Sequence, residues 1–382
     1  MKKILLVYPH NFYEHNSGIN SRYYELIKYF DKRNFNVDLF SLKNFESKWD
    51  TINKYTIKPI NNIFLYDFAK GKKKSKIKSL INNVIKKIIT HKQYGSLPDY
   101  AFPSMKKKLR EIIANNNYDY IIISYLYWAK LIEDLDYRGL IILEISDFLT
   151  LNLFDITNGS INIGNLINEE IHRAALFNKI ICISYDELLL FSQFIPTTEF
   201  YYVPFFLKDS SKKKKLKTIY DIVIIASDNP HNIKGINWFF SEVYNLLEKN
   251  ISIFIGGKIS KHIKQYQNIT KEFFVENIDK IYLSAKIAIC PLLGGSGIKI
   301  KVIEALSYGI PVVTTSKGVI GFKEKQNNGC IIANSPQSFA ESIHCLLYDK
   351  EKYYDTSKKA IDYFNKNFDA EKIYKDLDNI FH

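Results

Sequence analysis

Short apolar runs that alternate with helical patterns constrain the fold of this chain most strongly. The run KILLVY at residues 3–8 is typical of a buried strand, and apolar residues at helical spacing follow it. Alternation of this kind is the pattern of a parallel sheet covered by helices. These helix positions are Tyr23, Leu26, Ile27 and Phe30, and the expected strands are 3–8, 36–42, 118–125, 139–146, 179–184, 221–227, 251–257, 287–293, 310–315 and 329–333.

The strand-like runs fall into two series separated by a break. Residues 201–220 hold a proline, two serines and the run Lys212–Lys215, so we interpret them as a linker with solvated lysines. A chain of 382 residues also exceeds the size at which one core keeps growing. We therefore predict an α/β fold of two tandem Rossmann-like, doubly wound domains, at 1–206 and 207–363.

Composition limits the class of protein and its partners. The four cysteines form no CxxC pair, which argues against disulfides and a zinc site and favours a reducing cytoplasm. The apolar run at the start is too short for a signal peptide, and no later run reaches eighteen apolar residues. The net charge of +13 predicts an anionic partner, for which nucleic acid, acidic lipid and phosphate-bearing small molecules all qualify.

A glycine-rich turn follows the expected strand at 287–293 and leads into a helix that begins near Lys299 or Lys301. Such a turn offers backbone N–H groups and the positive end of a helix dipole to a phosphate. Two lysines at this end oppose the dipole unless an anion is bound, whereas Glu304 suits the hydroxyls of a ribose. The pattern predicts a site for a nucleoside diphosphate attached to a sugar. The turn consists of Gly294, Gly295, Ser296 and Gly297.

The stretch GGSGIKIKVIEALSYGIPVVTT resembles the signature of the retaining, nucleotide-sugar-dependent glycosyltransferases of family 4. That family has the GT-B architecture, in which two Rossmann-like domains flank an interdomain cleft. Further stretches are similar to other parts of the family pattern, so that most of the chain is covered. They are NSGINSRYYELIKYF, LEISDFLTL, NEEIHRAALFNKIICISYDELLLF and DIVIIASDNPHNIKGINWFF.

The resemblance implies a role for individual residues. Glu304 would hold the nucleotide ribose, and Lys301 and Lys299 would neutralise the diphosphate. Lys234, on the loop after the first strand of the second domain, resembles a phosphate-binding lysine, and Gly18 would let the backbone of the first domain approach the donor phosphate. The remaining donor-binding candidates are Gly294, Gly295, Ser296, Gly297, Ser227 and Asn232.

The chain departs from the family pattern at three serines. Ser296 stands where the family often has an acidic residue, Ser227 where it often has an arginine, and Ser146 where a histidine often precedes the aspartate. The usual histidine of the cleft is therefore not at this position, and His10 or His15 could substitute for it. Our candidates for contact with the acceptor are His10, His15 and Asp147.

The resemblance also implies a reaction. A sugar would move with retention from a nucleotide sugar, most simply a UDP-sugar, to a glycan, a lipid-linked or another glycoconjugate acceptor, in the cytoplasm and without a metal or cofactor. The leaving phosphate would take the proton of the acceptor, and a terminal helix at 364–382 would cross back to the first domain. Two Asp-x-Asp stretches, at 134–136 and 376–378, lie in helix-like segments, so we expect no metal there.

The role of residues 70–92 and three competing functions stay open. This lysine-rich segment has apolar residues at helical spacing and no acid, so it fits either an anionic membrane surface or a helix packed on the first sheet. A sugar-nucleotide epimerase of the same fold, or a non-catalytic partner subunit, would also fit the motifs. Nucleic acid is a weaker candidate, because no aromatic residues are interleaved with the clustered lysines.

Overall fold

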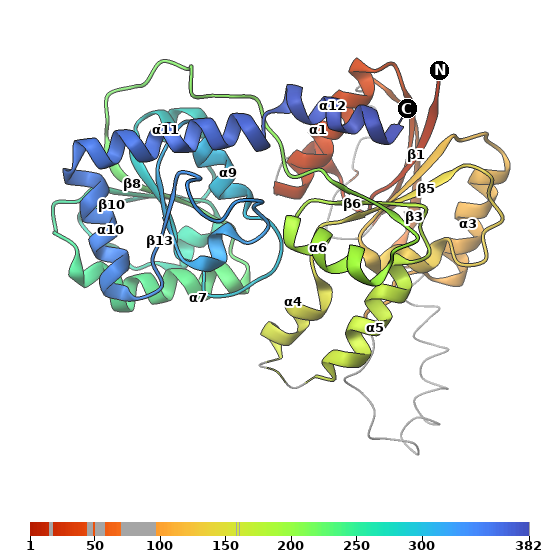
Figure 1. The fold of residues 1–382 in the computed structure, drawn as a ribbon, viewed down its shortest axis with the longest axis horizontal. Helices are drawn as coiled ribbons and strands as arrows, with labels where there is room; N and C mark the ends of the chain where they lie inside the picture. The colour runs from red at the N-terminus through yellow and green to blue at the C-terminus, as the bar shows by residue number, and fades with distance from the viewer. Residues whose placement is uncertain are drawn as a thin grey trace. The chain divides into compact units, whose positions relative to one another are not determined.

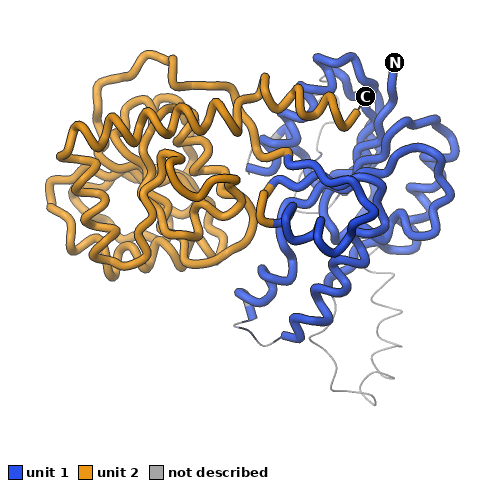
Figure 2. The backbone as a smooth tube through the Cα atoms, in the orientation of Figure 1, with its two compact units in different colours: residues 1–183, 187–202 blue, residues 184–186, 203–382 orange. Residues whose placement is uncertain are grey.

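The computed structural model describes residues 1–14, 18–43, 49, 58–69, 97–157, 159 and 161–381. They form two compact units, residues 1–183 with 187–202 and residues 184–186 with 203–382 (Figure 2). The predicted boundary after residue 206 lies close to the observed division, and residues 364–382 group with the second unit. That the terminal helix crosses back to the first unit stays a prediction.

The first unit is built on a seven-stranded sheet with the order β3-β2-β1-β4-β5-β6-β7, in which all neighbouring strands run parallel. The strand order reverses between β1 and β4, which in sheets of this kind places a ligand site at their carboxyl ends. The elements are β1 (Lys3–Val7), η1 (Phe12–Glu14), α1 (Gly18–Lys32), β2 (Asn36–Lys43), β3 (Ile60–Asp67), α3 (Pro103–Ala114), β4 (Tyr120–Ser124), η3 (Leu126–Leu131), β5 (Leu140–Ile145), α4 (Leu149–Ile156), α5 (Ile163–Ala174), β6 (Lys179–Cys182), α6 (Tyr185–Phe194) and β7 (Glu199–Tyr202).

The second unit has a six-stranded parallel sheet with the order β10-β9-β8-β11-β12-β13, and its order reverses between β8 and β11. Helices α9 and α11 pack together, as do α10 and the segment after α7 (Figure 1). The elements are β8 (Tyr220–Ile225), α7 (Pro230–Trp238), η4 (Phe239–Val243), η5 (Tyr244–Leu246), β9 (Ile253–Gly256), η6 (Lys258–His262), β10 (Ile269–Glu272), α8 (Ile278–Leu283), β11 (Ala285–Cys290), α9 (Ile300–Ser307), β12 (Val312–Thr314), η7 (Ser316–Val319), β13 (Cys330–Ile332), α10 (Pro336–Tyr348), α11 (Lys350–Asn367) and α12 (Ala370–Phe381).

All the predicted strands are present, and the two doubly wound α/β units confirm the predicted fold class. The sequence analysis missed β3, β7 and β10, which lie at edges of their sheets. Edge strands are covered less completely by helices, and most residues of these three strands are exposed or half-buried. They therefore lack the continuous apolar run that marks a buried parallel strand.

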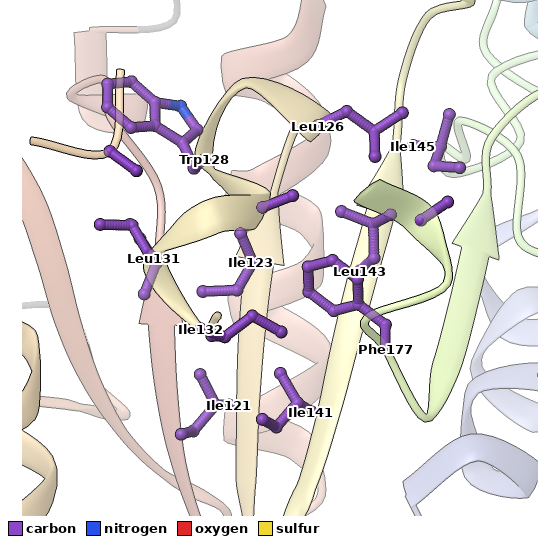
Figure 3. Packing of buried hydrophobic residues seen from close by; sticks show 14 of the residues in the cluster. Ile121, Ile123, Leu126, Trp128, Leu131, Ile132, Ile141, Leu143, Ile145 and Phe177 are labelled. Carbon is purple, nitrogen blue, oxygen red and sulfur yellow. The ribbon is translucent and has the colours of Figure 1, made fainter. Parts of the chain in front are cut away.

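Each unit has a hydrophobic core of its own, formed on its sheet. In the first unit, Ile121 and Ile123 of β4 lie beside Ile141 and Leu143 of β5, in register across the parallel pair. Figure 3 shows these side chains pointing to one face of the sheet, where residues that follow β4 cover them. Alternate residues of a strand point to opposite faces, so this register fixes which side chains the core receives.

Candidate functional site

The carboxyl ends of β8 and β11 bring two loops of the second unit together. Because β8 and β11 are neighbours at the point where the strand order reverses, the loops that follow them meet at one edge of the sheet. Gly235 of α7 lies directly against the end of β11, since an added Cβ would stand 2.2 Å from the carbonyl oxygen of Pro291. Only glycine fits at this contact between the two halves of the site.

We expect Gly235→Ala to destabilise the protein by about 2 kcal/mol or more, because backbone must move to relieve the clash. The matched control is Gly164→Ala in α5, where the nearest neighbour of the new Cβ would be 3.6 Å away. Urea unfolding of both variants measures the difference. Equal free energies of unfolding would show that α7 does not press against β11.

Helix α7 begins at an Asn-Pro pair, which fixes the position of the residues behind it. The side chain of Asn229 caps the helix by accepting a hydrogen bond from the backbone N–H of Asn232 at 2.8 Å, and Pro230 occupies the first turn. Lys234 therefore lies in the helix and not on the loop where we expected it. It is exposed, one helical turn after His231.

A chain of hydrogen bonds links three of the predicted donor-binding residues across the two loops. The Lys301 ammonium donates to Oδ1 of Asn232 at 2.5 Å. The amide nitrogen of Asn232 in turn donates to the carbonyl oxygen of Ser227 at 2.9 Å and to its hydroxyl at 3.2 Å. The structure thus brings together Ser227, Asn232 and Lys301 from segments that are far apart in the sequence.

Lys299 has a different environment from Lys301. Its ammonium donates to the carbonyl oxygens of Gly295, Ser296 and Gly297 at 3.1, 2.6 and 2.8 Å, and the residue is only 8% exposed. Gly295 and Gly297 have φ values of +95° and +73°, which favour glycine. Lys299 therefore holds the glycine turn in shape, and its predicted contact with a diphosphate stays a prediction.

Glu304 and Lys301 are both half-buried on α9, and burial shifts their pKa values in opposite directions. Burial raises the pKa of Glu304 to about 7, against the lowering effect of Lys301. Burial lowers the pKa of Lys301, against the raising effects of Cys290 and Glu304. Among the described residues the Glu304 carboxylate has no hydrogen-bond partner, so it can accept hydrogen bonds from a ligand.

Two small cavities meet at Lys301. One is also lined by Asn232, and the other is also lined by Tyr282. Cys290 lines both. Lys301 thus borders both cavities.

His231 is a site residue that the sequence analysis did not single out. A Cβ on Gly295 would lie 3.3 Å from two carbons of the His231 ring, so the imidazole covers the glycine turn. Its position in the first turn of α7, directly before Asn232, was the signal that could have identified it.

In the first unit, a cluster of aromatic and polar residues lies at the carboxyl ends of β1, β4 and β5. The ring of His10 packs edge-on against Tyr125 at 6.4 Å between centroids. Burial, and then the charge of Asp147, raise the pKa of both Tyr125 and Tyr127. Tyr125 has a φ of +63°, an uncommon backbone conformation for a tyrosine that is often found at functional sites. Sequence reasoning predicted His10 and Asp147 but missed the tyrosines.

The remaining predicted site residues lie in the first unit or outside the described residues. Gly18 is the first residue of α1, in the first unit, whereas Lys301 and Glu304 belong to the second. His15 and the segment 70–92 lie outside the described residues. A site shared by the two units stays a prediction.

The two Asp-x-Asp stretches differ in secondary structure, because 376–378 is helical as expected and 134–136 is not. Within the described ranges, no group of three or more His, Cys, Asp or Glu residues could hold a metal ion. Asp134 and Asp136 lie between η3 and β5, and Asp376 and Asp378 lie on α12. Within the same ranges, no helix is both long and apolar enough to cross a membrane.

Comparison with known proteins finds a family match within the second unit. Residues 220–349 match the family model of the Glycosyl transferases group 1. A protein of Klebsiella pneumoniae, described as an uncharacterized 44.6 kDa protein in the cps region, is 26% identical over 165 residues. This match covers 39% of the chain and 42% of the relative, so it spans less than half of either.

Solved structures resemble the chain over its full length. Sucrose-phosphate synthase from Thermosynechococcus elongatus has a TM-score of 0.72 at 13% identity, with 100% of this chain and 98% of that chain covered. A variant of S. aureus TarM, solved with fondaparinux, alpha-GlcNAc-glycerol and UDP, has a TM-score of 0.72 at 15% identity, with both chains fully covered. HepE from Anabaena, solved with UDP and glucose, has a TM-score of 0.67 at 14% identity, with 100% and 99% covered. These likenesses establish the shared GT-B fold.

Proposed function

We propose that this glycosyltransferase, whose residues 220–349 match the model of the Glycosyl transferases group 1, transfers a sugar from a nucleoside-diphosphate sugar to a glycan, lipid-linked or other glycoconjugate acceptor. The observation that carries the proposal is the chain Ser227–Asn232–Lys301, with Glu304 one turn further along α9. It sets the ammonium of Lys301 at the carboxyl ends of adjacent strands. The carboxylate of Glu304, which has no hydrogen-bond partner in the part of the chain that the structure describes, lies nearby on α9. This combination of a cation and a hydrogen-bond acceptor suits a diphosphate joined to a ribose.

In this proposal the second unit binds the donor. Lys301 neutralises the diphosphate, and Glu304 accepts hydrogen bonds from the two ribose hydroxyls. Lys299 keeps three carbonyl oxygens of the turn directed to itself, and therefore away from the phosphate that they would repel. Lys234 and His231 lie on one face of α7 and would approach the donor from the other loop.

The rate enhancement follows from the charge that develops on the leaving group. When the bond between sugar and phosphate breaks, negative charge grows on the diphosphate, and a cation already in place stabilises it without reorganisation. We propose that the reaction proceeds with retention and without a metal ion, and that the leaving phosphate accepts the proton of the acceptor hydroxyl. UDP in the TarM and HepE structures supports a UDP-sugar as the donor.

The first unit is the proposed acceptor domain. His10, Tyr125 and Asp147 lie at the carboxyl ends of its strands, where the Rossmann-like topology places ligands. The relative in a cps region supports a role in the synthesis of a surface polysaccharide or another glycoconjugate. We propose a cytoplasmic location, at the inner face of the membrane when the acceptor is lipid-linked.

A screen of donors tests the proposal. Thermal unfolding of the protein is recorded with UDP-, GDP-, dTDP- and CMP-sugars, and one class should raise the midpoint, because a ligand that binds the folded state stabilises it. The stabilising nucleotide sugar is then incubated with candidate acceptors, and we expect free nucleoside diphosphate to be released. Turnover to an isomeric nucleotide sugar without release would indicate an epimerase instead. Binding without turnover of any kind would indicate a non-catalytic partner subunit.

A further inference from the structure

The lysine run of the linker contacts the helix that carries Lys301 and Glu304. From the sequence we expected Lys212–Lys215 to be solvated, and all four are exposed in the structure, but two of them also make specific contacts. The ammonium of Lys215 donates to the carbonyl oxygen of Tyr308 at 3.1 Å, and that of Lys213 pairs with Asp279 at 2.7 Å. The contact of Lys215 lies at the carboxyl end of α9, and the contact of Lys213 lies on the neighbouring helix α8.

The linker supplies hydrogen-bond donors to the carbonyl groups at the end of α9. A helix leaves its last four carbonyls without partners inside the helix. Gly309, with a φ of +67°, closes the turn so that its own N–H and that of Ile310 bond to the carbonyls of Leu306 and Ala305. The two carbonyls that follow, those of Ser307 and Tyr308, receive the N–H of Ser210 at 2.9 Å and the ammonium of Lys215. The linker thus completes the end of the helix.

Aromatic packing extends this contact toward Glu304. Tyr308, 6% exposed, stacks on Tyr282 at 4.9 Å between centroids and an interplanar angle of 24°, and its hydroxyl bonds to Asp279. Tyr282 is buried close enough to Glu304 for that carboxylate to raise its pKa further. Glu304 itself precedes Tyr308 by one helical turn, so the two share a helix face.

We infer that the linker contacts at Ser210, Lys215 and Tyr308 position α9, and through it the carboxylate of Glu304 and the ammonium of Lys301. A cation at the carboxyl end of a helix is favourable, because it opposes the negative end of the dipole. The Lys213–Asp279 pair contributes less, since both side chains are more than 40% exposed and surface ion pairs are weak. Lys215 and Tyr308 are therefore positioning residues. Their effect on catalysis depends on the proposed donor site.

Two variants test the inference on the full chain. Lys215→Met removes the ammonium and keeps the stem, and Tyr308→Phe removes the hydroxyl and keeps the stack. In the protein without ligand, we expect amide hydrogen exchange in residues 300–308 to become about fivefold faster, while the affinity for UDP falls about fivefold. Lys215→Arg keeps a cation at this position and should have the exchange rate and UDP affinity of the wild type. Lys214 is an exposed lysine of the same run, and Lys214→Met should change neither quantity.

The two measurements separate the inference from the proposed function. Exchange in residues 300–308 that stays at the wild-type rate in both variants overturns the inference, whatever the protein binds. Faster exchange with unchanged UDP affinity also overturns it, because the contacts would then be structural only. Faster exchange in a protein that binds no UDP supports the positioning of α9 and removes the assignment of a UDP site.

Discussion

Lys301→Ala should lower kcat by about a hundredfold or more. Lys301 lies between the two loops of the site, bonded to Asn232, with its ammonium held in a half-buried position. Removal of one preorganised donor to a developing negative charge typically costs about 3 to 4 kcal/mol in the transition state. Steady-state release of the nucleoside diphosphate with a saturating acceptor measures the effect.

The matched control for this prediction is Lys358→Ala, which removes an exposed lysine from α11 in the same unit. It should keep the wild-type kcat. Circular dichroism and the thermal midpoint of Lys301→Ala should remain close to those of the wild type. A folded Lys301→Ala protein with normal turnover would mean that Lys301 does not face the leaving group.

Glu304→Ala should likewise lower turnover about a hundredfold or more. A second variant, Glu304→Gln, should change the pH dependence of donor binding. Burial raises the pKa of Glu304 to about 7, so the carboxylate is mostly ionised above pH 7 and mostly protonated below it. Only the ionised group accepts hydrogen bonds from both ribose hydroxyls without competition from its own proton. The affinity for a UDP-sugar should therefore fall as pH decreases through 7, toward about tenfold per pH unit.

This pH dependence should disappear in Glu304→Gln, whose amide does not titrate. The diphosphate of a nucleotide sugar is a diester, so it does not titrate in this range either, and the measurement reports on the protein. Glu341→Gln, on the exposed face of α10, is the control and should keep the wild-type profile. A pH profile that is the same in Glu304→Gln and the wild type would assign the titration to another group.

Sequence periodicity predicted the buried strands and the order of elements, because strands covered on both faces have continuous apolar runs. It could not predict β3, β7 and β10, whose exposed edge positions allow polar residues such as those of INNIFLYD. The glycine turn and the start of α9 were predictable for another reason. Positive φ values at Gly295 and Gly297 leave few residue types that fit.

Side-chain partners were much less predictable than elements. Lys299 and Lys301 are two residues apart and look equivalent in the sequence, yet one bonds to three carbonyls of its own turn and the other to Asn232. The difference depends on which way each side chain leaves the first turn of α9, and the sequence does not record it. The hydrogen bond of Lys215 could not be predicted for the same reason, since its partner Tyr308 is far away along the chain.

Titration of the wild-type protein and of Lys301→Ala with UDP in an isothermal calorimeter tests the central claim most directly. That claim is that the turn at 294–297 and the first residues of α9 hold the diphosphate of the donor. We predict measurable binding by the wild type and an affinity at least about tenfold lower in Lys301→Ala, since bonds to charged groups contribute about 1.5 to 3 kcal/mol. Equal affinity in the two proteins would contradict it.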